Sequence, residues 1–154
     1  MSVEMIFNRS QEDVSKAQAL IMEKVQKFIP LTDNEILTLE KGTLTINTLN
    51  RIETKQQELK NLLNEIGYWD TDVVNKEWNS TEIFNIAEFQ RILENENILR
   101  KAFFVYKHTP DTPEALYYFQ NINDIEQILN DIDVMINNVK SHYKECGNFE
   151  CGEM

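Results

Sequence analysis

The sequence has few of the residues that build tight turns, disulfides or catalytic sites. Its 154 residues include 4 Gly, 3 Pro, 2 Cys and 2 His. So little Gly and Pro disfavours an all-β fold, which needs many turns, and two cysteines are too few for a disulfide scaffold. The sequence also lacks a signal peptide and an apolar run of membrane-spanning length, so we expect a protein made in a cytoplasm, without membrane insertion.

Basic residues are in the minority. The chain has 15 Lys and Arg against 26 Asp and Glu, which gives a formal net charge of −11, and its basic residues are scattered. Phosphates would be repelled by this charge, so we expect no binding to nucleic acid or to anionic lipid. We interpret the acidity as a solubility feature that also permits a basic partner.

Motifs of known catalytic or metal sites are absent from the sequence. It has no Ser/His/Asp arrangement, no Gly-rich phosphate loop and no His-Glu-x-x-His motif. His142, Cys146 and Cys151 offer three ligands, whereas a closed zinc site needs four. Asp70 and Asp72 lie in an acidic loop that lacks the spacing and the glycine of an EF-hand. We therefore predict no enzymatic activity, no metal site and no cofactor.

The strongest pattern that is present lies between residues 123 and 143. Asn123 is the predicted N-cap of a long helix, with Glu126 as its capping-box partner. The opposite side of this helix, which includes Glu126 and Asp131, is expected to face water, and other elements must cover the apolar side. Its apolar residues recur in steps of three and four and form one stripe: Ile125, Ile128, Leu129, Ile132, Met135, Ile136, Val139 and Tyr143.

Further capping signals predict four helices before this one. In the helix expected from Asn47 to Gly67, Gln56 interrupts the apolar stripe, so the middle of that helix is expected to be exposed. The predicted fold is an all-α, irregular bundle of four or five helices in residues 1–144, followed by an extended tail of residues 145–154. The expected helices run from Ser10 to about Phe28, from Thr32 to Gly42, from Asn47 to Gly67 and from Asn85 to about Ala102. The apolar stripes of the first two helices place these residues in the core: Val14, Ala17, Ile21, Val25, Phe28, Ile36, Leu37 and Leu39.

Two stretches are candidate contact surfaces. Tyr68, Trp69 and Trp78 stand among polar residues in an irregular segment, and aromatic anchors dominate protein interfaces. The alternative is that these rings cover the ends of the helical core. The C-terminal tail repeats a Glu-Cys-Gly unit, and Phe149 in this tail is the fourth candidate contact residue.

The chain contains a set of motifs in a fixed order: Asn8-Arg-Ser-x-x-Asp-Val14, Leu49-Asn-Arg-Ile-Glu53, Thr109-Pro-Asp-Thr-Pro-Glu114, Asn123-Asp-Ile-Glu-x-Ile-Leu-x-Asp-Ile-Asp133 and the repeated tail. Together these motifs resemble a module of tail-region proteins from prophages and phage-tail-like particles of AT-rich Gram-positive bacteria. In the family the tail usually reads Ser-Gly-Glu, whereas Cys146 and Cys151 take the serine places here. The resemblance implies a virion location near the baseplate or tail fibre, and it carries over no catalytic residue.

We therefore expect a structural component of such a particle, held by protein–protein contacts with other tail and baseplate proteins in multiple copies. One alternative is a module at the particle tip that binds host-surface glycan or protein, which exposure of Trp69 and Trp78 in a groove would favour. Another is a small cytoplasmic regulator or assembly chaperone, which an open groove along the 123–143 helix would favour.

Overall fold

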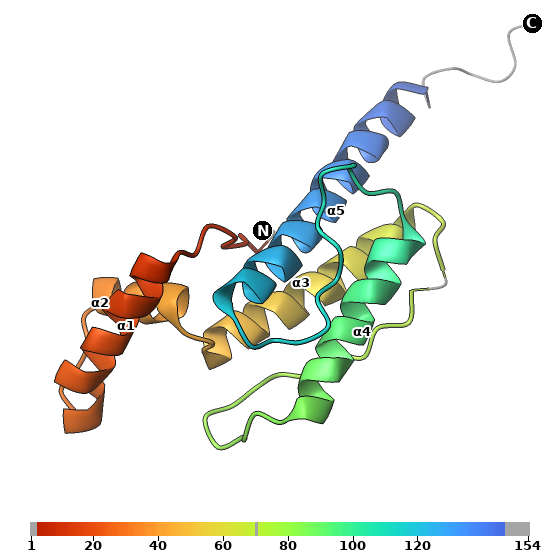
Figure 1. Ribbon diagram of the computed structural model, residues 1–154. Coiled ribbons are helices and arrows are strands. Elements are labelled where there is room, and N and C mark those ends of the chain that lie inside the picture. Colours follow the sequence, from red (N-terminus) through yellow and green to blue (C-terminus); the bar gives the residue numbers. More distant parts are fainter. Residues whose placement is uncertain (1–2, 70, 147–154) are drawn as a thin grey trace, which may run out of the picture.

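The computed structural model describes residues 3–69 and 71–146, the last four by their backbone only (Figure 1). Within these residues the chain forms α-helices and one short 3-10 helix and no strand, so the all-α prediction is confirmed. The elements in chain order are α1 (Gln11–Glu23), η1 (Val25–Lys27), α2 (Asp33–Gly42), α3 (Ile46–Glu65), α4 (Ile86–Ala102) and α5 (Phe119–Cys146).

Two parts make up the molecule. Helices α3, α4 and α5 each pack against the other two and form a three-helix bundle. Helices α1 and α2 pack against each other as a hairpin, which projects from the end of the bundle at which α3 and α5 begin (Figure 1). The two long loops, residues 66–85 and 103–118, connect the helices of the bundle.

Local capping sets three of the predicted helix starts. Ser10 with Asp13 and Thr32 with Glu35 form capping boxes, and the Asn85 side chain accepts from the backbone N–H of Glu88 at 3.0 Å. These contacts lie within four residues of sequence, which explains why the sequence predicts them.

Two predicted caps are wrong, because a residue upstream already begins the helix. Thr45 caps α3 and accepts from the N–H of Thr48 at 3.1 Å, while the Asn47 side chain donates to Glu40. Helix α5 begins at Phe119, so Asn123 lies inside it. The far end of α5 continues through Cys146, the second residue of the predicted tail, whereas residues 147–154 lie outside the described residues.

The core lies between the three bundle helices, and the predicted stripes of α3, α4 and α5 supply it. Burying each such side chain stabilises the fold by about 1.5–3 kcal/mol relative to exposure. The fully buried apolar residues are Leu49, Ile52, Leu59, Leu63, Ile92, Leu99, Ile125, Ile128, Leu129, Ile132 and Ile136.

Three polar residues that were predicted to be exposed are buried. Gln56 and Glu126 have no exposed surface, and Asp131 is 4% exposed. Each finds a partner on a segment distant in sequence: Gln56 on α4, Glu126 on the chain before α1, and Asp131 at Thr109. Burial of a polar group is tolerated when its hydrogen bonds are made inside the protein, and periodicity along one helix does not reveal those partners.

Candidate functional site

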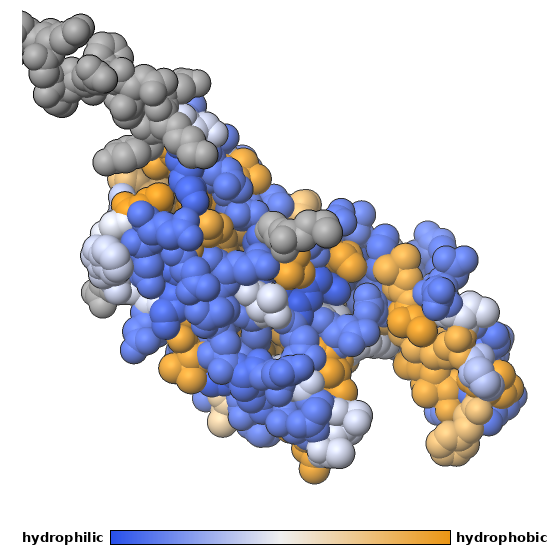
Figure 2. Space-filling model, turned by 180° about the vertical axis from the view of Figure 1, so that it is seen from behind, coloured by the Kyte–Doolittle hydropathy of each residue, from blue (hydrophilic) through white to orange (hydrophobic). Residues whose placement is uncertain are grey.

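The α1–α2 hairpin carries an unusual amount of exposed apolar surface. Phe28 is 95% exposed and Met22 is 66% exposed. Figure 2 shows hydrophobic surface gathered over this projecting part of the molecule. Six large apolar side chains of the hairpin are exposed, each by on the order of 100 Å². Their summed exposed area is roughly 600 Å², which is the upper end of what a monomer exposes in one patch. The residues, which we call the hairpin patch, are Met22, Val25, Phe28, Ile29, Ile36 and Leu37.

The prediction that Val25, Phe28, Ile36 and Leu37 belong to the core is therefore wrong. Their stripe is apolar, but α1 and α2 pack mainly against each other, and neither makes an extensive contact with the bundle. The two short helices bury Ala17 and Leu20 of α1 against α2 and have no second layer to cover the rest. An amphipathic pattern predicts that a face can be buried, whereas the partner that buries it must come from elsewhere.

The tip of the hairpin holds Phe28 in a strained conformation. Helix α1 ends at Glu23, and the chain passes through η1 to Phe28, whose φ of 56° lies in the left-handed region. A bulky residue there is a genuine outlier and costs about 1–2 kcal/mol. Strain of this kind persists at functional positions, and the Phe28 ring at this position is almost completely exposed.

Close packing of α1 on α2 makes the hairpin stiff. Gly42 is buried at the end of α2, and a Cβ at this position would lie 2.3 Å from both Ala17 Cβ and the Asp13 carbonyl oxygen. The absence of a side chain therefore permits this close approach of the two helices. Lys24 and Glu35, 2.5 Å apart, add an ion pair between the two arms.

An ion cluster anchors the base of the hairpin to the bundle. Glu126 Oε1 lies 2.8 Å from Arg9 Nη2 and 2.8 Å from Arg51 Nη2. The backbone N–H of Arg9 donates to Asn123 Oδ1 at 3.1 Å, and Glu40 of α2 approaches Arg51 at 3.8 Å. Burial lowers the pKa of Arg9 from its ordinary value, and Glu126 opposes that shift by stabilising the charged guanidinium.

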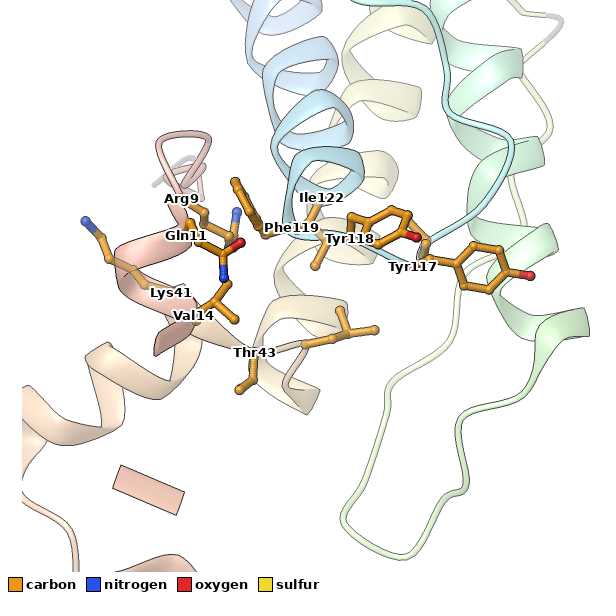
Figure 3. A pocket seen from close by; sticks show the side chains of 12 residues that line it. Arg9, Gln11, Val14, Lys41, Thr43, Tyr117, Tyr118, Phe119 and Ile122 are labelled. Atoms are coloured by element: carbon orange, nitrogen blue, oxygen red, sulfur yellow. The ribbon is translucent and has the colours of Figure 1, made fainter. Parts of the chain in front are cut away.

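A small cleft separates the hairpin from the bundle beside this anchor. Its volume is about 220 Å³, and Val14 and Thr43 from the hairpin face Phe119 and Ile122 from α5 across it (Figure 3). Lys41 points away from the space (Figure 3). The cleft lies at the junction between two packed parts of the molecule.

The predicted contact residues separate into three cases. Trp69 is 78% exposed, and Tyr68 beside it packs edge-on against Phe103 with ring centroids 5.1 Å apart. Trp78 is 3% exposed and its indole Nε1 donates to Glu53 at 2.6 Å, so it belongs to the core and is not a surface anchor. Phe149 lies outside the described residues.

Two hollows flank Trp69. One, of about 600 Å³, lies between the end of α3 and α5, and the other, of about 610 Å³, lies toward α4. An exposed indole between two hollows is the kind of anchor found at interfaces. The sequence-based prediction of Trp69 as a contact residue is thus consistent with its exposure.

A buried polar network around Glu96 was missed by the sequence reading. Gln56 donates to Glu96 at 3.1 Å and to the Ile92 carbonyl at 3.0 Å, and Asn95 donates to Gln56 at 3.2 Å. Burial raises the pKa of Glu96 to about 8, with the hydrogen bond from Gln56 opposing the shift. The available signal was the position of Gln56 and Glu96 within apolar stripes, because polar residues at core positions imply partners.

A second buried carboxylate, Glu53, joins α3 to α4 and to the loop between them. It accepts from the backbone N–H of Lys76 and from Trp78 Nε1, both at 2.6 Å, and pairs with Arg91 at 2.6 Å. The hydrogen bond to Glu53 is the largest influence on the pKa of Arg91, which is raised. Both networks connect structural elements through carboxylates that are themselves buried, so we assign them to stability.

Among the side chains of residues 3–69 and 71–142, which are those that the structure describes, no group of three or more His, Cys, Asp or Glu could hold a metal ion. None of the helices in the described part of the chain has the length and apolar composition needed to cross a membrane.

Comparison of the chain with family models, with curated proteins and with solved structures gave no match.

Proposed function

We propose that this protein is a structural component of a phage or phage-tail-like particle, in the baseplate or tail-fibre region, and that it acts through protein–protein contacts. The observation that carries the proposal is the hairpin patch: six large apolar side chains exposed on a stiff hairpin that projects from the bundle. Exposed apolar patches of this size mark interaction sites. A particle subunit needs such a surface to hold its neighbours, whereas an isolated soluble domain gains nothing from it.

Residues of the motifs behind the family resemblance meet in the folded chain. Arg9, Arg51 and Glu126 come from three separate motifs and meet in one buried ion cluster. Thr109 and Asp131 come from two motifs and form a hydrogen bond of 2.6 Å. These motif residues stabilise the fold, so we look for the partner surface outside them.

The test is the composition of tail particles purified from an induced source strain. We expect mass spectrometry to find this chain at stoichiometric abundance in the particles. A strain that carries Phe28→Asn together with Met22→Ser should lose the chain from particles while the soluble protein stays folded. The matched control is Ile83→Ser, because Ile83 is 85% exposed but lies outside the hairpin. Absence of the wild-type chain from particles, with the chain abundant in the soluble lysate, would overturn the proposal.

A second candidate function, binding of a host-surface glycan or protein, draws support from Trp69. Its indole is exposed between two hollows, as a ring that stacks on a ligand must be, whereas the burial of Trp78 leaves the site with a single tryptophan. Binding of labelled protein to host cells, compared between the wild type and Trp69→Ala, tests this function. Equal binding by the two proteins would remove it.

A further inference from the structure

The α1–α2 hairpin is a single layer of helices with apolar surface that nothing covers in the described chain. Close packing of α1 on α2 buries Ala17 beside Gly42, where no room remains for a further side chain. The hairpin makes no extensive contact with the bundle, so the six residues of the hairpin patch stay exposed. Amphipathic helices gain stability when a second layer covers their apolar side, and for the hairpin this layer must come from another molecule.

The hairpin patch is one gathered surface. It draws on both arms and on the tip, from Met22 of α1 through Phe28 to Leu37 of α2. Figure 2 shows hydrophobic surface gathered over this part of the molecule. Outside the hairpin, strongly exposed apolar side chains such as Ile83 and Phe104 are distributed over the two long loops. The hairpin is therefore the part of the described chain that is best suited to an apolar contact.

The area of the patch fits a contact between two copies of the chain. Its exposed area is roughly 600 Å². Two patches that cover each other would therefore bury roughly 1,200 Å² in total, which reaches the size of a specific interface. The patch placed against a loop with one exposed apolar side chain would bury much less apolar area. A second hairpin patch is thus the surface of this chain that matches the first.

Charged residues of both signs adjoin the patch. Glu23 and Lys27 lie next to Met22 and Phe28 in the chain, and both are exposed. A two-fold contact brings a surface against itself, so a surface that carries both signs can pair a cation of one copy with a carboxylate of the other. The hairpin meets this requirement, whereas a surface of one sign would repel its own copy.

We propose that two copies of this protein pair through their hairpin patches, so that the two hairpins cover each other as a four-helix bundle. The inference rests on the proposed function, in which the hairpin patch holds a neighbour, and it names that neighbour as a second copy of the chain. The contact is isologous, because the same residues act on both sides, and it closes at a dimer. Four helices in two layers bury apolar faces that two helices leave exposed.

The dimer leaves the far end of each three-helix bundle open to other contacts. The hairpin projects from the end of the bundle at which α3 begins (Figure 1), whereas Trp69 follows the end of α3. Helix α3 has 20 residues, which corresponds to a length of about 30 Å. Pairing therefore occupies the hairpins and leaves Trp69 exposed, so the dimer can act as a building unit that other proteins contact through the bundle.

Sedimentation equilibrium of the full chain tests the proposal. We expect the average mass of the wild type to rise with concentration from 18.2 kDa and to level off at twice this value. Phe28→Asn combined with Met22→Ser removes the two most exposed side chains of the patch and should weaken the dimer on the order of tenfold or more. Since both residues are exposed, far-UV circular dichroism should show an unchanged helical content. Ile83→Ser, outside the hairpin, should pair as the wild type does.

A mixture of the labelled double variant with unlabelled wild type identifies the surface on the other side of the contact. If patch meets patch, the variant binds the wild type more weakly than the wild type binds itself. Binding of the variant with unchanged affinity would place the other side outside the hairpin and overturn the proposal. A wild type that stays monomeric up to submillimolar concentration, or whose mass rises beyond the dimer, would also overturn it.

The failure of this inference and the failure of the proposed function are distinguishable. If the wild type is monomeric in solution while the double variant is lost from particles, the pairing of copies is wrong and the particle function stands. If the wild type is dimeric while the chain is absent from particles, the particle function is wrong and the pairing stands.

Discussion

The three-helix bundle and the α1–α2 hairpin use their apolar residues in opposite ways. The bundle buries most of its large aliphatic side chains and also encloses the carboxylates of Glu53, Glu96 and Glu126. The hairpin buries little beyond Ala17, Leu20 and Gly42, and it exposes the six residues of the hairpin patch. Both regions carry amphipathic helices, so the difference lies in whether a second layer covers them. The bundle is built for stability, and the hairpin is built to present a surface.

The largest effect should come from removing the carboxylate that joins the two regions. Glu126→Ala removes the carboxylate shared by Arg9, whose side chain is 1% exposed, and Arg51, which keeps only the more distant Glu40 at 3.8 Å among the ion pairs of the described residues. Unpaired buried charge is strongly destabilising, so we expect the free energy of unfolding to fall by about 3–5 kcal/mol. Urea unfolding followed by circular dichroism measures this change. Glu94→Ala, which removes an exposed carboxylate of α4, serves as the control and should change stability by less than about 0.5 kcal/mol.

The next effect concerns the pH dependence of the bundle. Burial raises the pKa of Glu96 from an ordinary value near 4.5 to about 8, so the folded protein holds a proton that the unfolded chain releases above pH 4.5. This contribution to stability is complete below pH 4.5 and is lost as pH rises through about 8, with a slope of at most about 1.4 kcal/mol per pH unit.

Glu96→Gln should remove that slope, because a neutral amide replaces the protonated acid. Urea unfolding at a series of pH values compares the variant with the wild type. Glu94→Gln should leave the slope unchanged, since that side chain is exposed. Equal slopes for Glu96→Gln and the wild type would show that Glu96 does not titrate as its burial implies.

Gly42→Ala should act on the hairpin and spare the bundle. The added Cβ would meet Ala17 Cβ and the Asp13 carbonyl at 2.3 Å, so α1 and α2 must separate, at a cost of about 1–3 kcal/mol. Native-state hydrogen exchange should show faster exchange in α1 and α2 and unchanged exchange in α3. Gly67→Ala is the contrasting variant. A Cβ at this position would have free space, but the φ of +96° strains any residue other than glycine, and this backbone strain would fall on the bundle. Loss of protection in α3 by Gly42→Ala would contradict the separation of the two regions.

The smallest effect on stability should come from the most exposed residue. Phe28→Asn places a residue that tolerates the left-handed conformation where Phe is strained, so we expect a gain of about 0.5 kcal/mol in the free energy of unfolding. Urea unfolding measures it at a concentration where the wild type is monomeric. A loss of more than about 1 kcal/mol would mean that the Phe28 ring packs against its own chain.

Predictions succeeded where the determining contacts are close in sequence. The Ser10–Asp13 and Thr32–Glu35 capping boxes and the cap at Asn85 involve residues three apart, so their geometry is set by the local chain. The candidate site was predicted in part. Trp69 is on the surface, whereas Trp78 is in the core. Four of the six residues of the hairpin patch are exposed although the sequence places them in the core, namely Val25, Phe28, Ile36 and Leu37. A tryptophan among polar residues looks the same in the sequence whether it is buried or exposed. Only the residues that pack against it in the folded chain decide which of the two it is.

The sequence by itself determined that this protein is helical, where α1, α2 and α4 begin, and which faces of α3, α4 and α5 are apolar. Only the tertiary structure decided that Glu126 and Gln56 are buried while Phe28 and Met22 are exposed. The physical reason is that periodicity and capping act within one turn or one helix, whereas burial depends on what packs against that helix. Glu126 is covered because Arg9 and Arg51 reach it from distant segments, and the hairpin patch stays open because no segment of the described chain covers it.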